Sequence, residues 1–197
     1  MSVQRTASVK RKTRETDIKL KIDLDGSGES KISTGVGFFE HMLTALAKHG
    51  RLNFELSCTG DLHIDEHHTV EDVVIVLGEA FAKALGDKAG TRRFAHAYAP
   101  LDEALSRVVV DLSGRGFLSF HGDLGREKVG DLSTELVEDF WRAFATRAGI
   151  TLHMEIIYGT NAHHMVESLF KAAALALHSA TRIDPAVKGV PSTKGVL

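Results

Sequence analysis

The stretch ETDIKLKIDLDGSGES at residues 15–30 alternates apolar and polar side chains, reaches Asp-Leu and turns on two glycines. The stretch EALSRVVVDLSGRGFL at residues 103–118 repeats the opening glutamate, the alternation, the Asp-Leu and the glycine-rich turn. Such alternation is typical of half-buried strands, and glycines between strands indicate tight connections. The similarity predicts that one structural unit occurs twice in this chain.

The two halves continue to match beyond these strands. Segments 36–50 (VGFFEHMLTALAKHG) and 133–149 (STELVEDFWRAFATRAG) have the apolar spacing of amphipathic helices and end at glycine. Segments 51–60 and 150–159 each predict a strand closed by glycine. A longer helix follows in each half, over His67–Leu85 and over His163–Thr181. We expect Asp65 and Asn161 to act as the N-caps of these two helices.

Each half therefore predicts the order strand, strand, strand, helix, strand, helix. We expect an α+β fold of two mainly antiparallel sheets, each covered by helices on one face. The first half spans residues 1–91 and the second residues 92–197, and because each is small they should form one compact unit. The Gly/Pro-rich tail 184–197 is expected to be a loop that becomes ordered when it binds a ligand.

Composition limits the possible classes of protein. The chain has 197 residues, 43% hydrophobic content and a net charge of −2, which does not favour binding to nucleic acid or to an anionic membrane. The single Cys58 and the lack of a long apolar run are typical of a cytoplasmic protein. The basic N-terminus could be a nucleic-acid arm, but the alternation of Val3, Arg5, Ala7 and Val9 favours a surface strand.

The motif His-His-x-x-Glu occurs once at the start of each long helix, as His67, His68 and Glu71 and again in residues 163–167. Residues three or four apart share a helix face, whereas neighbours point about 100° apart. Each pair therefore indicates two ions, or one ion and a substrate. For a single motif, a chance pair of histidines on a helix face would be about as good an explanation as metal binding. Two motifs at matching places in a duplicated unit favour metal binding.

The preceding helix of each half adds another candidate ligand. His41 in FFEHML and Asp139 in LVEDFW occupy nearly equivalent places in the repeat. Imidazole and carboxylate ligands without thiolate favour Mn, Fe, Ni or Zn over a structural cysteine site. His49 lies two turns after His41 on the same predicted helix. It either lines the same pocket or is an ordinary surface histidine.

Several basic and hydroxyl side chains suggest a phosphate site. They are Arg93, Arg115, Lys171, Ser192 and Lys194. Taken singly, such residues are most often solvated surface groups. Together they could hold a doubly charged phosphate through bidentate arginine and lysine contacts. No Walker or GxGxxG motif occurs, so a nucleotide is not indicated.

The segments TRETDI, GVGFFEHMLTALAKHG, VVVDLSGRG and GVPSTKGVL and both His-His stretches resemble the imidazoleglycerol-phosphate dehydratases of histidine biosynthesis. The resemblance implies a duplicated unit like domain 2 of ribosomal protein S5 and a homo-oligomer of 24 subunits built from trimers. It also implies two Mn²⁺ ions per active site, held where subunits meet. Where many relatives have a histidine, this chain has Asp139, a shorter but hard oxygen donor suited to Mn²⁺.

The resemblance also implies roles for individual residues. One ion would be held by His41, His68, Glu71 and His164, and the other by His67, Asp139, His163 and Glu167. The substrate-binding set would comprise Glu15, His41, His49, His67, Glu71, Arg93, Arg115, His163, Lys171, Ser192 and Lys194.

The implied reaction removes water from imidazole glycerol phosphate and gives imidazole acetol phosphate. The C–H bond to be broken is barely acidic, and metal on the ring nitrogens would supply an electron sink as an imidazolate. Glu15 and Glu167 are the candidate catalytic carboxylates for the proton. Two alternatives use the same ligands: a dimetal hydrolase of a phosphorylated substrate, and a non-enzymatic metal-binding protein.

Overall fold

The computed structural model describes residues 5–197 and confirms the predicted α+β architecture. The first sheet has the strand order β1-β2-β4-β3 and the second the order β5-β6-β10-β7. The strands of the first sheet are β1 (Thr6–Lys12), β2 (Thr16–Asp23), β3 (Ser30–Ser33) and β4 (Asn53–Gly60). Those of the second sheet are β5 (Phe94–Leu101), β6 (Ala104–Asp111), β7 (Phe117–His121) and β10 (Thr151–Tyr158). The helices are α1 (Gly37–Gly50), α2 (His67–Leu85), α3 (Glu135–Ala148) and α4 (Ala162–Thr181).

The two sheets have the same topology, as a duplicated unit requires. In the first, β2 pairs antiparallel with β1 and β4, and β3 joins β4 in parallel. In the second, β6 pairs antiparallel with β5 and β10, and β7 joins β10 in parallel. The predicted N-terminal strand is present as β1, at the edge of the first sheet. Val3, where that prediction began, lies outside the described residues.

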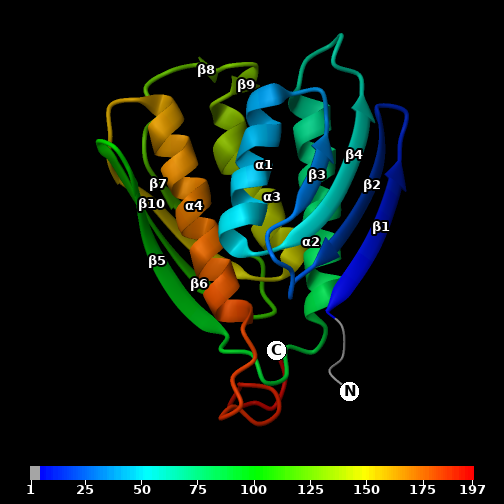
Figure 1. Cartoon of the computed structure of the whole chain (residues 1–197), viewed down its shortest axis with the longest axis vertical. Coiled ribbons are helices and arrows are strands. Elements are labelled where there is room, and N and C mark those ends of the chain that lie inside the picture. Colours follow the sequence, from blue (N-terminus) through cyan, green and yellow to red (C-terminus); the bar gives the residue numbers. More distant parts are fainter. Residues whose placement is uncertain (1–4) are drawn as a thin grey trace.

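All four helices lie between the two sheets (Figure 1). Helix α2 packs on β1 and β2, α4 packs on β5 and β6, and α1 and α3 pack against α4 and α2 respectively. A shared aromatic core joins the halves: the ring centroids of Phe81 on α2 and Phe144 on α3 are 5.4 Å apart, and those of Phe39 on α1 and Phe140 on α3 are 5.8 Å apart. Because this core continues through both halves, one hydrophobic interior supports both sheets.

The second half also contains a short hairpin that the sequence did not predict. Its strands are β8 (Lys128–Val129) and β9 (Leu132–Ser133), and residues 5–91 contain no counterpart. The hairpin caps the N-terminus of α1, because Asp131 accepts hydrogen bonds from the backbone N–H groups of Gly37 and Phe38 at 2.6 and 3.0 Å. An element of the second half thus fixes a helix of the first.

The predicted N-cap is confirmed for α4 and is wrong by one residue for α2, whose N-cap is Glu66 and not Asp65. The Asn161 side chain accepts hydrogen bonds from the backbone N–H groups of His163 and His164. Asp65 accepts a hydrogen bond from the N–H of His67 at 2.9 Å, although Glu66 is the residue directly before α2. Among the described residues, no helix combines the length and apolar character needed to cross a membrane.

Candidate metal centre

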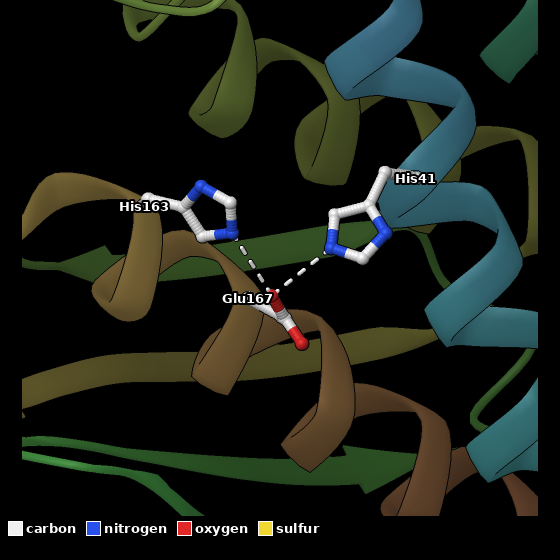
Figure 2. A group of neighbouring side chains, drawn as sticks. All are labelled: His41, His163 and Glu167. Atoms are coloured by element: carbon white, nitrogen blue, oxygen red, sulfur yellow. Dashed lines mark hydrogen bonds and ion pairs between the residues drawn. The ribbon is translucent and has the colours of Figure 1, made fainter.

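Three of the predicted ligands meet between α1 and α4. His41 Nε2 and His163 Nε2 each lie 3.1 Å from the same carboxylate oxygen, Oε2 of Glu167 (Figure 2). All three ligand atoms lie within 4.8 Å of one another. Two ligands that bind one ion at right angles, with bonds of about 2.1 Å, are about 3 Å apart. The separation and the donor chemistry therefore fit a divalent transition-metal ion.

The helices explain why these side chains converge. His163 and Glu167 are four residues apart on α4 and so share a face, while α1 packs along α4 and brings His41 to them. Phe38 supports the group, since its ring contacts the His163 ring edge-on at a centroid distance of 4.9 Å. The hairpin that caps α1 through Asp131 therefore also fixes the surroundings of His163.

Glu167 is held as a carboxylate. Burial would raise its pKa, but hydrogen bonds from Lys171, His41 and His163 lower it to about 2. Lys171 Nζ lies 2.7 Å from Glu167 Oε1, on the next turn of α4. The pKa of His49 is lowered by burial and then by the charge of Lys171, so His49 lies within electrostatic reach of this group.

The equivalent residues of the other half form a more open arrangement. His67, Glu71 and Asp139 line one groove of about 430 Å³ between α2 and α3. His41 and Asp139 are each the fifth residue of their helices, which confirms their equivalence in the repeat. Over residues 5–197, however, the cluster around Glu167 is the one place where three such ligand atoms come within 4.8 Å.

The second histidine of each pair points away from these sets and binds a carboxylate through Nδ1. His68 Nδ1 lies 3.0 Å from Asp61 Oδ2, and His164 Nδ1 lies 2.7 Å from Glu103 Oε2. Hydrogen bonds to these carboxylates raise the pKa of both imidazoles. The hydrogen bond with His164 and those from the Asn161 and Thr160 backbone lower the pKa of Glu103 to about 2.

Neither Asp61 nor Glu103 was among the predicted site residues. Glu103 could have been found from the sequence, because the repeat aligns it with Glu15 at the start of the matched strands. Asp61 precedes the first His-His pair by several residues and has no such signal. Its contact with His68 follows from the path of the loop between β4 and α2.

The grouping of ligands within one chain differs from the division implied by the resemblance. That division assigned His41 to one ion and His163 with Glu167 to the other, whereas the chain brings all three together. The first histidine and the glutamate of each motif lie on one helix face, and the second histidine lies on another. Each intrachain set therefore takes one histidine and one glutamate from the same motif.

Glu15 lies in the β1–β2 turn near the first motif. Its Oε1 is 3.9 Å from His68 Nε2, and its side chain is half exposed. The turn is tied to α2 by buried Asp72, which accepts hydrogen bonds from Thr16 Oγ1 at 2.5 Å and Arg11 Nε at 2.9 Å. Glu15 is thus held at a fixed place beside the His-His helix.

The predicted phosphate-binding residues do not all come together in one chain. Arg93 binds the carboxylate of Asp111 and the backbone oxygen of Pro191 in the tail, at 2.7 Å in each case. The tail follows the far end of α4, and Figure 1 shows the C-terminus at that end of the molecule. Glu167 lies about 20 Å from there along the helix axis, at 1.5 Å per residue.

Lys171 is therefore the one predicted phosphate ligand beside the Glu167 cluster. The others lie at the opposite end of the folded molecule, where Leu197 also lies against Gly114. They are Arg93, Arg115, Ser192 and Lys194. The candidate metal ligands and most of the candidate phosphate ligands occupy opposite ends of the molecule.

Comparison with known proteins identifies the family. The sequence profile of the imidazoleglycerol-phosphate dehydratases matches residues 34–177. The dehydratase of Gluconacetobacter diazotrophicus is 57% identical over the full length of both chains. That of Acetivibrio thermocellus is 55% identical over 99% of this chain and 100% of the relative.

Solved structures agree with the sequence relatives. The dehydratase of Staphylococcus aureus superposes with a TM-score of 0.83 at 40% identity, covering 91% of this chain and 99% of that one. The enzyme of Pyrococcus furiosus gives 0.82 at 34% identity, covering 96% and 100%. The matches include both His-His motifs and both sheets, and the chain belongs to the imidazoleglycerol-phosphate dehydratase family.

Proposed function

We infer that this chain catalyses the reaction for which its family is named, the dehydration of imidazole glycerol phosphate to imidazole acetol phosphate in histidine biosynthesis. It is a carbon–oxygen lyase that acts on a small phosphorylated imidazole. The observation that carries this conclusion is the full-length similarity to dehydratases together with the converging ligands of the His-His motifs. A dimetal hydrolase and a non-enzymatic metal-binding protein are not favoured.

We propose that the site binds two Mn²⁺ ions. His41, His163 and Glu167 would hold one, and His67, Glu71 and Asp139 the other. One further ligand for each set would come from a neighbouring copy of the chain, as the second histidine of a His-His pair, His68 or His164. Bound to the imidazole ring of the substrate, the metal supplies Lewis acidity that makes the ring an electron sink. Nitrogen and oxygen donors without thiolate are compatible with Mn²⁺, the metal that the family resemblance implies.

Glu15 is the better candidate for moving the C–H proton. Glu167 is a proposed metal ligand, and its Oε1 lies 2.7 Å from Lys171 Nζ, so its oxygens are already engaged and poorly placed to accept a proton from the substrate. Glu15 lies beside His68, half exposed and on a turn fixed by Asp72. It can therefore face a ligand without first giving up a strong internal contact.

The substrate phosphate is expected to meet the remaining basic residues. Lys171 supplies a positive charge beside the Glu167 cluster, and Arg115 and Lys194 are exposed at the other end of the chain. Because these two ends lie apart, Arg93, Arg115, Ser192 and Lys194 would come from a different copy than the metal ligands. Arginine and lysine side chains suit a doubly charged phosphate.

A homo-oligomer follows from the same arrangement, and we propose the 24-subunit shell built from trimers. Two observations support association. The second histidines point away from their own chain's ligand sets, and the outer face of the second sheet exposes large apolar residues. These include Phe94 and Tyr98 on β5 and Phe117 on β7, which are 60%, 50% and 55% exposed. For the location of the protein we propose the cytoplasm. Cys58 is buried and forms no disulfide, as expected in a reducing compartment.

The decisive test follows product formation. The purified protein with Mn²⁺ should convert imidazole glycerol phosphate to a ketone without releasing inorganic phosphate. A dimetal hydrolase would release phosphate instead, and a metal-storage protein would leave the substrate unchanged. Either of these two results would overturn the proposed function.

A further inference from the structure

The second histidine of each motif is held through the same ring nitrogen in both halves, although different elements supply the partner. Asp61, from the loop between β4 and α2, binds His68 Nδ1 at 3.0 Å. Glu103, from the turn between β5 and β6, binds His164 Nδ1 at 2.7 Å. The repeat aligns Glu103 with Glu15, not with Asp61. Both halves therefore have a carboxylate bound to Nδ1 of the second histidine, although the two carboxylates come from non-equivalent positions of the repeat.

The other nitrogen of each ring, Nε2, has no carboxylate within hydrogen-bond distance. His68 Nε2 is 3.9 Å from Glu15, and His164 Nε2 is 3.9 Å from Asp102, distances beyond a hydrogen bond. The His68 and His164 side chains are 34% and 28% exposed, so part of each ring remains accessible while Nδ1 is engaged by a carboxylate. A neutral imidazole carries one proton, and the nitrogen without it donates a lone pair.

We propose that Asp61 and Glu103 are positioning residues that place the proton of the second histidine on Nδ1 and leave Nε2 as the metal-binding nitrogen. The inference rests on the proposed metal site, to which these histidines would bring the ligand from a neighbouring copy. A carboxylate accepts hydrogen bonds and donates none, so it enforces one tautomer and one ring orientation.

The surroundings of Glu103 make it the sharper test. Its Oε1 accepts hydrogen bonds from the backbone N–H groups of Asn161 at 2.8 Å and Thr160 at 3.2 Å, while Oε2 faces His164. In Glu103→Gln the amide oxygen must stay with these two N–H groups. The NH₂ group then faces Nδ1 and donates to it, which moves the imidazole proton to Nε2.

Asp61 provides an independent check in the first half. Its Oδ1 is buried and has no hydrogen-bond partner within residues 5–197, so no neighbour would fix the orientation of an amide there. Asp61→Ala is therefore the cleaner variant. It removes the acceptor from His68 Nδ1 and leaves the ring free to adopt either tautomer.

The experiment compares Glu103→Gln with Asp102→Asn in the full-length protein. Asp102→Asn is a matched control, since it removes a carboxylate beside the same ring without touching Nδ1. The tautomer is read from ¹⁵N spectra of histidine-labelled, metal-free protein at alkaline pH, where imidazole is neutral. Manganese affinity is measured by competition with a fluorescent chelator. Far-UV circular dichroism and the melting temperature confirm folding.

We expect Glu103→Gln to move the His164 proton to Nε2 and to weaken Mn²⁺ binding about 10- to 100-fold, the usual effect of losing such a partner. Asp102→Asn should keep the Nδ1–H tautomer and lose clearly less Mn²⁺ affinity than Glu103→Gln, since it removes only a nearby charge. Asp61→Ala should give mixed His68 tautomers and weaker binding. An unchanged His164 tautomer in folded Glu103→Gln would overturn the proposal, as would equal losses of affinity in Glu103→Gln and Asp102→Asn.

The two readouts separate this inference from the function on which it rests. If the parent protein bound no Mn²⁺, the proposed metal site would fail while the tautomer spectra still decided the roles of Asp61 and Glu103. If the parent bound Mn²⁺ and the tautomers did not respond, the metal site would stand and the positioning role would fail.

Discussion

Replacing Glu66 by glutamine should weaken the attachment of the β8–β9 hairpin to α2. The Glu66 side chain is buried and accepts hydrogen bonds from Ser133 N at 2.8 Å, Ser133 Oγ at 2.6 Å and Lys128 Nζ at 3.2 Å. Burial alone would raise its pKa, but these bonds together lower the pKa to about 2 from 4.5. The folded protein therefore prefers the ionised carboxylate strongly.

The size and pH dependence of the effect follow from that pKa. A fall from 4.5 to about 2 corresponds to about 3 kcal/mol of stability, at about 1.4 kcal/mol for each factor of ten. Because the folded-state pKa is depressed, this stability is fully present above pH 4.5 and is lost as the pH falls through about 2. Near pH 3 the contribution should have dropped to about 1.4 kcal/mol.

Urea unfolding at fixed protein concentration, without metal, measures the difference. Glu66→Gln should lower the free energy of unfolding by about 2–3 kcal/mol at pH 7, and by about half of that near pH 3. Glu127→Gln is the control, since it removes the same charge from an exposed position beside the hairpin and should change stability by under about 0.5 kcal/mol. Equal effects in the two variants, or a Glu66 effect that grows in acid, would refute the reasoning.

Three further predictions concern metal, phosphate and assembly. His68→Ala and His164→Ala should fold but lose bound Mn²⁺ and activity, and full occupancy by elemental analysis in both would contradict the ligand assignment. Lys194→Ala should weaken substrate binding about 10- to 100-fold, the cost of one charge-assisted contact, with inorganic phosphate as a competitor; unchanged KM in the Arg93, Lys171 and Lys194 variants would exclude the phosphate site. Chelation with EDTA should shift light scattering toward smaller species, and Mn²⁺ should restore the large one, because binding to the assembled state alone stabilises it. A fully active monomer that binds two Mn²⁺ ions would refute this last prediction.

The repeated patterns of the sequence were sufficient to predict the fold and to single out His41, His163 and Glu167 as candidate ligands. Alternation around residues 15–30 and 103–118 set the sheets, and the spacing of His163 and Glu167 placed them on one helix face. His41 was found because the preceding helix repeats with Asp139 at the same position. These features depend on local periodicity, which a single chain displays directly.

Features that depend on distant contacts were not predictable in the same way. The β8–β9 hairpin has strands of two residues each, too short for any periodicity, and its role lies in Asp131 capping a helix far away in sequence. The partnership of Asp61 with His68 depends on a loop path. The separation of the tail from Glu167 depends on the direction of α4, which the sequence pattern does not reveal.

The central claim is that this chain dehydrates imidazole glycerol phosphate with metal held by both His-His helices. The most direct measurement follows ketone formation and bound Mn²⁺ together, in protein stripped of metal and then titrated with Mn²⁺. The account predicts no activity without metal and full activity at two Mn²⁺ ions per active site, with no inorganic phosphate released. Full activity in the stripped protein, or phosphate in place of the ketone, would contradict it.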